Sequence, residues 1–110
     1  MATADDFFAI EMRVGTVLEA ASFPEARKPA IKLRIDFGPE LGEKRSSAQL
    51  TMHYRPDQLV GRQVVAAVNL GTRRIAGFVS EVLVLGAMPD EREVVLLALD
   101  QPVANGTRIG

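Results

Sequence analysis

The sequence predicts an all-β fold, a small barrel or sandwich. Apolar and charged residues alternate strictly over Ile31–Phe37, as in a strand with one buried face. Two continuous apolar runs, Val64–Val68 and Val94–Leu99, are typical of strands buried on both sides. Turn signals separate roughly five to seven such short segments, and little of the chain has helical periodicity.

The N-terminal elements follow from capping and alternation. Asp5 and Asp6 precede Phe7 and Phe8, which predicts a short helix within residues 1–10. The segment 13–23 then alternates as a strand, in which Gly15 predicts a bulge or a bend. Two prolines mark 23–29 as a loop.

The middle of the chain contains the clearest strand and a weaker one. In the 31–37 strand the apolar side chains are expected inward and the charged ones outward. We expect a turn at 38–43 and a polar strand at 46–51. Pro56 predicts a helical turn over 55–59, because proline suits the first helical position.

Two more apolar strands are expected in the C-terminal half. Residues 78–85 form one and residues 94–99 the next, with a charged turn at 88–93 between them. A turn-rich tail follows over 100–110. The apolar surface of 64–68 and 94–99 exceeds what a small barrel interior requires, so a second copy of the chain is expected to cover part of it.

Length and charge limit the possible functions. The chain has 110 residues, which suits one domain, and a net charge of −1, which argues against binding that is dominated by nucleic-acid phosphates. The N-terminus has no signal-peptide pattern, and no apolar run is long enough for membrane insertion. These features predict a soluble, cytoplasmic protein.

The residue types needed for catalysis are largely missing. His53 is the single histidine and there is no cysteine, which argues against a metal site and against a catalytic triad. No phosphate-binding or dinucleotide-binding glycine motif is present, so no cofactor is expected. We therefore predict that the chain is not an enzyme.

Basic pairs and exposed apolar residues are the remaining candidates for binding. Four groups of cations lie on expected loops or outer strand faces, where they are either solvated or converge on a ligand: Arg27–Lys28, Lys32 with Arg34, Lys44–Arg45 and Arg73–Arg74. Phe23, in the proline-rich loop, and Met88 are expected at the surface. Both are candidates for contact with an extended hydrophobic peptide.

Two segments resemble the tRNA-binding OB-fold domain that is appended to some methionyl- and tyrosyl-tRNA synthetases. They are Glu11–Val17 and Asn69–Glu81. Over nearly its whole length, the chain is also similar to a small stand-alone branch of that family, which consists of export-related chaperones. The segments that carry this second resemblance are Phe23–Arg27, Ala30–Leu33, Ile35–Gly38, Ser46–Gln49, Arg73–Phe78, Ser80–Gly86, Asp100–Val103 and Asn105–Thr107.

The resemblance implies a single OB-fold domain over residues 1–110, a five-stranded barrel with a short N-terminal helix. Terminal extensions, the helix at 1–10 and a C-terminal part at 87–110, would form a homodimer. It also implies a cytosolic protein-secretion chaperone that binds unfolded precursor proteins and the translocation ATPase SecA. No ATP would be needed.

The candidate ligand-binding residues, for peptide or for tRNA, comprise five that match the family motif and three further polar or charged residues. They are Asn69, Arg73, Arg74, Ser80, Glu81, Gln49, Lys32 and Arg34. Two departures from the tRNA-binding pattern, Ser47–Leu50 in place of Val-Ser-Gly and Leu83 in place of Met, predict weakened tRNA affinity. Three hypotheses stay open at this point: a peptide-binding chaperone, a tRNA binder with little sequence readout, and a dimeric scaffold for one protein partner.

Overall fold

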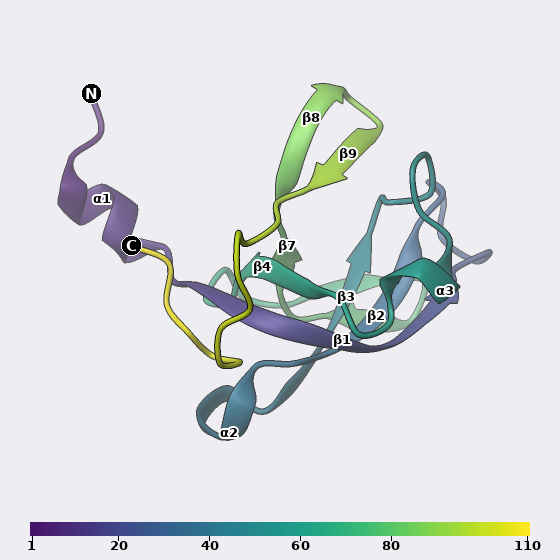
Figure 1. Cartoon of the computed structure of the whole chain (residues 1–110). Coiled ribbons are helices and arrows are strands. Elements are labelled where there is room, and N and C mark those ends of the chain that lie inside the picture. Colours follow the sequence, from purple (N-terminus) through teal and green to yellow (C-terminus); the bar gives the residue numbers. More distant parts are fainter.

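A computed structural model of the chain, which describes all of residues 1–110, has a nearly closed five-stranded antiparallel barrel at its centre (Figure 1). The strand order is β3-β2-β1-β4-β7, so β1 lies in the middle. The predicted all-β, OB-type barrel is therefore confirmed. The five strands are β1 (Met12–Ser22), β2 (Ile31–Asp36), β3 (Glu43–Ala48), β4 (Gln63–Ala67) and β7 (Leu83–Val84).

Short elements decorate the barrel. Two hairpins extend from it, and one of them, formed by the eighth and ninth strands, projects away from the barrel together with the N-terminal helix (Figure 1). None of the three helices has the length and apolar character needed to cross a membrane. These elements are α1 (Ala4–Ala9), α2 (Gly38–Leu41), α3 (Pro56–Leu59), β5 (Arg73–Ile75), β6 (Phe78–Ser80), β8 (Gly86–Asp90) and β9 (Glu93–Leu96).

The long strand β1 organises the barrel because it pairs on both edges. Its first half pairs with β4 and its second half with β2. The register with β2 shifts between Val17 and Glu19, which marks a bulge. A bulge bends a strand and increases its twist, and both effects help a short sheet to curl toward closure.

The predicted alternation in β2 is confirmed. Ile31, Leu33 and Ile35 are buried in the core, while the charged residues between them are only partly covered. Phe37, directly after the strand, is completely buried. Three of the twelve residues of the main core cluster come from β2, and their burial removes apolar area from water and so stabilises the fold.

Gly15 has a different role from the one predicted. It pairs in regular register with Val64, and the bulge lies further along the strand. A Cβ atom at Gly15 would lie 2.6 Å from Ile35 and 2.8 Å from the Phe37 ring. Glycine is therefore required because the core side chains of β2 and of Phe37 pack directly onto the β1 backbone.

Several boundaries differ from the prediction. Residues 38–41 form α2 rather than a simple turn, and β3 begins at Glu43. The single strand expected over 78–85 is divided into β6 and β7, because Glu81 and Val82 leave the extended path where the barrel closes. The charged turn expected at 88–93 is shorter in the structure. Only residues 91–92 form it, because β8 extends to Asp90 and β9 begins at Glu93.

The two apolar runs differ in their burial. Residues 64–67 are almost completely buried within the single chain, so this run needs no second copy to cover it. Residues 94–99 are not a buried strand. Only Leu96 of that run is buried, and Val95 and Leu97 are 41% and 45% exposed.

We predict that Gly15→Ala lowers the free energy of unfolding by about 1–3 kcal/mol, the usual cost of overpacking a core. The added methyl group must displace Ile35 or Phe37. Urea unfolding followed by circular dichroism measures the change. Ala21→Val, which adds bulk at an exposed position of the same strand, is the control and should change stability by less than about 0.5 kcal/mol. Equal stability of Gly15→Ala and wild type would contradict the close packing.

Candidate functional site

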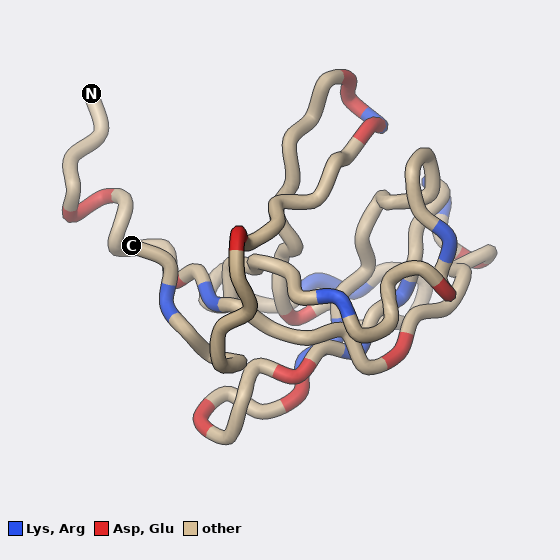
Figure 2. The backbone as a smooth tube through the Cα atoms, in the orientation of Figure 1, with Lys and Arg blue, Asp and Glu red and all other residues tan.

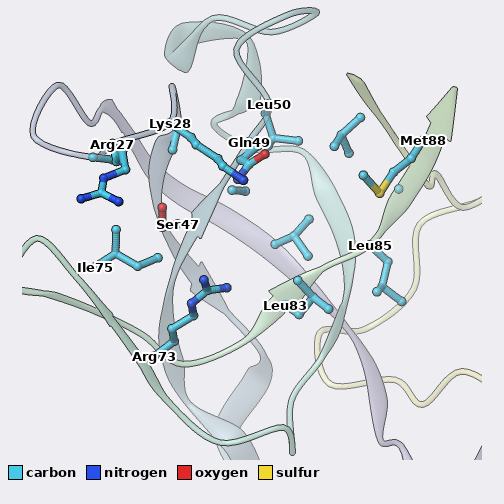
Figure 3. Close-up of a pocket in the computed structure, with 16 residues that line it drawn as sticks. Arg27, Lys28, Ser47, Gln49, Leu50, Arg73, Ile75, Leu83, Leu85 and Met88 are labelled. Atoms are coloured by element: carbon cyan, nitrogen blue, oxygen red, sulfur yellow. The ribbon is translucent and has the colours of Figure 1, made fainter. Parts of the chain in front are cut away.

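An open groove of about 530 Å³ lies on one side of the barrel (Figure 3). Ten of its sixteen lining residues are hydrophobic. The lining residues are Ala26, Arg27, Lys28, Ala30, Ser47, Ala48, Gln49, Leu50, Arg73, Ile75, Leu83, Val84, Leu85, Gly86, Met88 and Val94.

Four parts of the chain build most of the groove, and Val94 of β9 completes it. They are the β1–β2 loop, the end of β3, the β5–β6 hairpin inserted between β4 and β7, and the segment from β7 into β8. In OB-folds, the loop between the first two barrel strands and the loop between the last two flank the ligand-binding surface. The β1–β2 loop and the β5–β6 hairpin occupy these two positions, so the groove coincides with the surface on which OB-folds bind ligands.

One half of the groove is apolar and open to solvent. Leu83 is 53% exposed and Met88 is 61% exposed, while Leu85 and Val94 are partly buried behind them. Figure 3 shows Leu83, Leu85 and Met88 along the same wall. Large apolar side chains that are held open in a concave surface favour a ligand with apolar groups of its own.

The other half of the groove is basic. Arg27 and Lys28 lie on one side of it and Arg73 on the other (Figure 3). No acidic residue lines the groove, and these three cations form no ion pair within the chain. Their charge is therefore available to a ligand, although the net charge of the whole chain is −1. Figure 2 shows acidic and basic residues distributed together along the rest of the backbone.

Two predicted cations differ in their surroundings. Lys32 lies over the rings of Phe23 and Phe78, with its Nζ 5.0 Å and 5.8 Å from the two ring centroids. Arg34 pairs with Glu19 and Glu43, and these hydrogen bonds, first that to Glu19, raise the pKa of its guanidinium. Neither cation lines the groove. Arg34 is also the less available of the two, because two carboxylates already neutralise it.

The aromatic residues near the groove are largely covered. Phe23 is only 4% exposed, which overturns the expectation that it lies at the surface. Its ring packs edge-on against Phe78, at 5.5 Å between centroids, and Arg45 lies over Phe78 from another direction. Nucleic-acid binding by OB-folds usually uses exposed rings for base stacking. Phe23 and Phe78 offer little free ring surface for it.

Ser80 and Glu81, both predicted to bind ligand, hold the barrel together. The Ser80 hydroxyl oxygen accepts a hydrogen bond from the backbone N–H of Ser47 at 3.0 Å. A Glu81 carboxylate oxygen accepts one from the backbone N–H of Arg45 at 3.0 Å, and the Glu81 N–H donates to the Arg45 carbonyl at 2.8 Å. Ser46 adds a buried hydrogen bond to the carbonyl of Val82 at 2.9 Å. We call these contacts the closing seam.

Asn69 connects the barrel to the N-terminal segment. Its carbonyl oxygen accepts a hydrogen bond from the backbone N–H of Glu11 at 2.8 Å, and its amide donates to the carbonyl of Ala9 at 2.9 Å. Both polar atoms of the side chain are therefore engaged within the chain. Asn69 lies outside the groove lining.

The other predicted residues divide between the groove and the opposite surface. Gln49 and Met88 line the groove, as does Arg73. Arg74 does not, because neighbouring residues of a strand point to opposite faces. From the sequence, Arg27 and Lys28 were identified as a basic pair but were not predicted to belong to the site. Their place in a proline-flanked loop between two barrel strands was the available signal.

No group of three or more His, Cys, Asp and Glu side chains is arranged to hold a metal ion.

Comparison with known proteins agrees with the barrel and the position of the groove. Residues 12–108 match a family model described as "Putative tRNA binding domain". The chain belongs to this family of tRNA-binding domains, which is not a catalytic family. It is 35% identical over 105 residues to the methionine–tRNA ligase of Parabacteroides distasonis and 34% identical over 107 residues to that of Thermotoga maritima. The chain spans only 15% and 16% of these ligases, so the match is to a domain of each enzyme.

Within this family, the chain resembles CsaA chaperones over its full length. A crystal structure of chaperone CsaA from Bacillus anthracis has 54% identity and a TM-score of 0.94, covering 100% of this chain and 99% of the other. A CsaA chaperone protein from Picrophilus torridus has 44% identity and a TM-score of 0.91, with full coverage of both chains. The predicted resemblance to the stand-alone chaperones of this domain family is thereby confirmed.

We predict that Ser80→Ala lowers the free energy of unfolding by about 1–3 kcal/mol, because the N–H of Ser47 loses its acceptor at the closing seam. The matched control is Ser47→Ala, which removes a groove-lining hydroxyl that forms no hydrogen bond within the chain. Thermal or urea unfolding compares the two variants. If Ser47→Ala proves as destabilising as Ser80→Ala, the seam does not depend on the Ser80 hydroxyl.

Proposed function

We propose that this protein is a chaperone of protein secretion that binds unfolded precursor polypeptides, without ATP, in the groove. The observation that carries the proposal is the open apolar half of the groove, where Leu83 and Met88 are more than half exposed. An unfolded polypeptide exposes apolar side chains that need such a surface. The full-length similarity to proteins named CsaA chaperone supports the same function.

The groove has the groups that an extended polypeptide requires. Apolar side chains of the substrate would contact Leu83 and Met88, and burial of one such side chain contributes about 1.5–3 kcal/mol when complete. Gln49 and Ser47 lie in the same lining and would pair with backbone N–H and C=O groups of the substrate. The affinity would depend on the apolar contacts, so many sequences would be accepted.

A homodimer belongs to the same proposal. Helix α1 buries none of its residues within the chain, and both Phe7 and Phe8 are exposed. The exposed Val95 and Leu97 lie in the C-terminal extension 87–110. A six-residue helix is not stable in isolation, so a partner surface would stabilise it. Two grooves on one dimer would raise the effective affinity for a long unfolded chain.

The cellular partners are further parts of the proposal. Unfolded precursor proteins would be bound in the cytoplasm and passed to the translocation ATPase SecA. The motif-level resemblance to export-related chaperones is the support for this step.

The chaperone proposal predicts that the wild-type protein suppresses aggregation of a chemically unfolded substrate when present in several-fold excess. The double variant Leu83→Ser with Met88→Ser should need roughly thirtyfold more protein, since each half-exposed side chain contributes about 1 kcal/mol of apolar contact and the two together about 2 kcal/mol. Light scattering after dilution from denaturant measures the effect. Val60→Ser is the matched control, because Val60 is 54% exposed and lies outside the groove. Absence of suppression by the wild type would refute the proposal.

A second candidate function is tRNA binding with little sequence readout. The unpaired cations Arg27, Lys28 and Arg73 support it, as does membership of a tRNA-binding domain family. Phosphate contacts alone would carry the affinity, because the nearby aromatic rings are covered by Lys32 and Arg45. Such binding responds to fold and charge of the RNA rather than to its bases.

The tRNA candidate predicts different effects for two adjacent residues. Arg73→Ala should weaken tRNA binding and reduce the slope of log affinity against log salt by about 1, because one phosphate contact is lost. Arg74→Ala should leave both quantities unchanged, since Arg74 is outside the groove. Filter binding or fluorescence anisotropy at several salt concentrations measures both. Undetectable tRNA binding at low salt eliminates this candidate.

A further inference from the structure

A second, smaller hollow continues the groove at one end. Its volume is about 190 Å³, and it shares Lys28 and Gln49 with the groove. Its other lining residues are Pro29, Thr51, Met52 and Arg92. The two hollows therefore differ in chemistry: the larger is mostly apolar, whereas the smaller has one apolar residue and two cations.

The two cations of the small hollow come from separate parts of the fold. Lys28 lies in the β1–β2 loop and Arg92 in the turn between β8 and β9. Both side chains are exposed, and neither forms an ion pair within the chain. The tertiary fold thus brings two unneutralised charges to one depression.

The acidic residues closest in sequence to Arg92 do not line this hollow. Asp90 and Glu91 share the hairpin turn with Arg92 (Figure 2), but neither lines the hollow. The carboxylate of Asp90 accepts a hydrogen bond from the N–H of Glu91 at 2.7 Å. Glu93 is bound to His53, with 2.7 Å between the carboxylate oxygen and Nε2. No carboxylate lines the hollow, and none forms an ion pair with Lys28 or Arg92.

We propose that the small hollow binds a carboxylate of the polypeptide held in the groove. The preferred substrates would then be segments in which an Asp or Glu side chain lies close to apolar side chains. This inference rests on the proposed peptide-binding function and defines its substrate class. Apolar contacts with Leu83 and Met88 supply affinity, and the pair Lys28 and Arg92 selects the charge of the neighbouring residue.

The expected energies agree with a division in which apolar contacts supply affinity and the two cations supply selectivity. Both cations are exposed, so solvent and salt weaken their attraction to a carboxylate, and each contributes little to affinity on its own. Selectivity is larger than either contribution, because a Lys or Arg placed in the hollow meets two like charges. Segments rich in basic residues are therefore disfavoured at this end of the groove.

The apolar lining favours polypeptide over nucleic acid as the source of the anion. Leu83, Met88 and their neighbours offer nothing to a sugar-phosphate backbone, and the adjacent rings of Phe23 and Phe78 are covered by Lys32. A polypeptide can carry an apolar side chain and a carboxylate only a few residues apart. Because an extended chain advances about 3.3 Å per residue, such a segment can reach both of the adjoining hollows.

Three fluorescent peptides test the inference. They share one apolar extended sequence and differ at a single flanking position, which is Glu, Gln or Lys. Anisotropy titrations at low salt should give about threefold tighter binding for the Glu peptide than for the Gln peptide, and weaker binding again for the Lys peptide. Arg92→Gln should reduce the difference between Glu and Gln, and Arg92→Gln combined with Lys28→Gln should abolish it. Arg74→Gln, which removes an unpaired charge outside both hollows, should preserve it.

The possible results separate this inference from the proposed function. Equal affinity for all three peptides overturns the carboxylate site but leaves the peptide-binding groove. No binding of any peptide overturns both. If Arg92→Gln weakens binding of a short single-stranded RNA and leaves the Glu peptide unaffected, the hollow binds phosphate and the inference is wrong.

Discussion

The closing seam between β3 and residues 80–82 is the interaction on which the rest of the structure depends. β7 is only two residues long, so its backbone hydrogen bonds alone are too few to close the barrel. The seam replaces the missing ladder with Ser46, Ser80 and the carboxylate of Glu81. Because Ser80 ends the β5–β6 hairpin and Val82 leads into β7, the same contacts hold Arg73 and Leu83 on the two sides of the groove.

The groove combines two chemistries that a ligand meets together. Arg27, Lys28 and Arg73 keep their charge available because no carboxylate reaches them, whereas Arg34 is neutralised by Glu19 and Glu43. Leu83 and Met88 keep their apolar surface exposed in the other half of the groove. A nearly neutral chain thus has a basic, apolar concavity on the ligand-binding side of an OB-type barrel.

Much of the fold could be predicted from the periodicity of apolar residues, whereas the functional site could be predicted only in part. The alternation in β2 and the apolar run of β4 correspond directly to buried faces, since a strand's two faces are separated by a period of two. Motif resemblance located the segment 69–81 but not the roles of its members. Asn69 and Ser80 bond within the chain, because their partners, Glu11 and Ser47, are distant in sequence and only folding brings them near.

By itself, the sequence determined the barrel class, its core strands and the tRNA-binding domain family, because these depend on local patterns and on motifs that are read along one chain. Only the tertiary structure decided which polar residues remain free for a ligand. Phe23 was expected at the surface and is buried, while Arg27 and Lys28 form one side of the groove. The physical reason is that availability depends on neighbours from other strands: a cation, a ring or a hydroxyl is free only if no distant residue folds onto it.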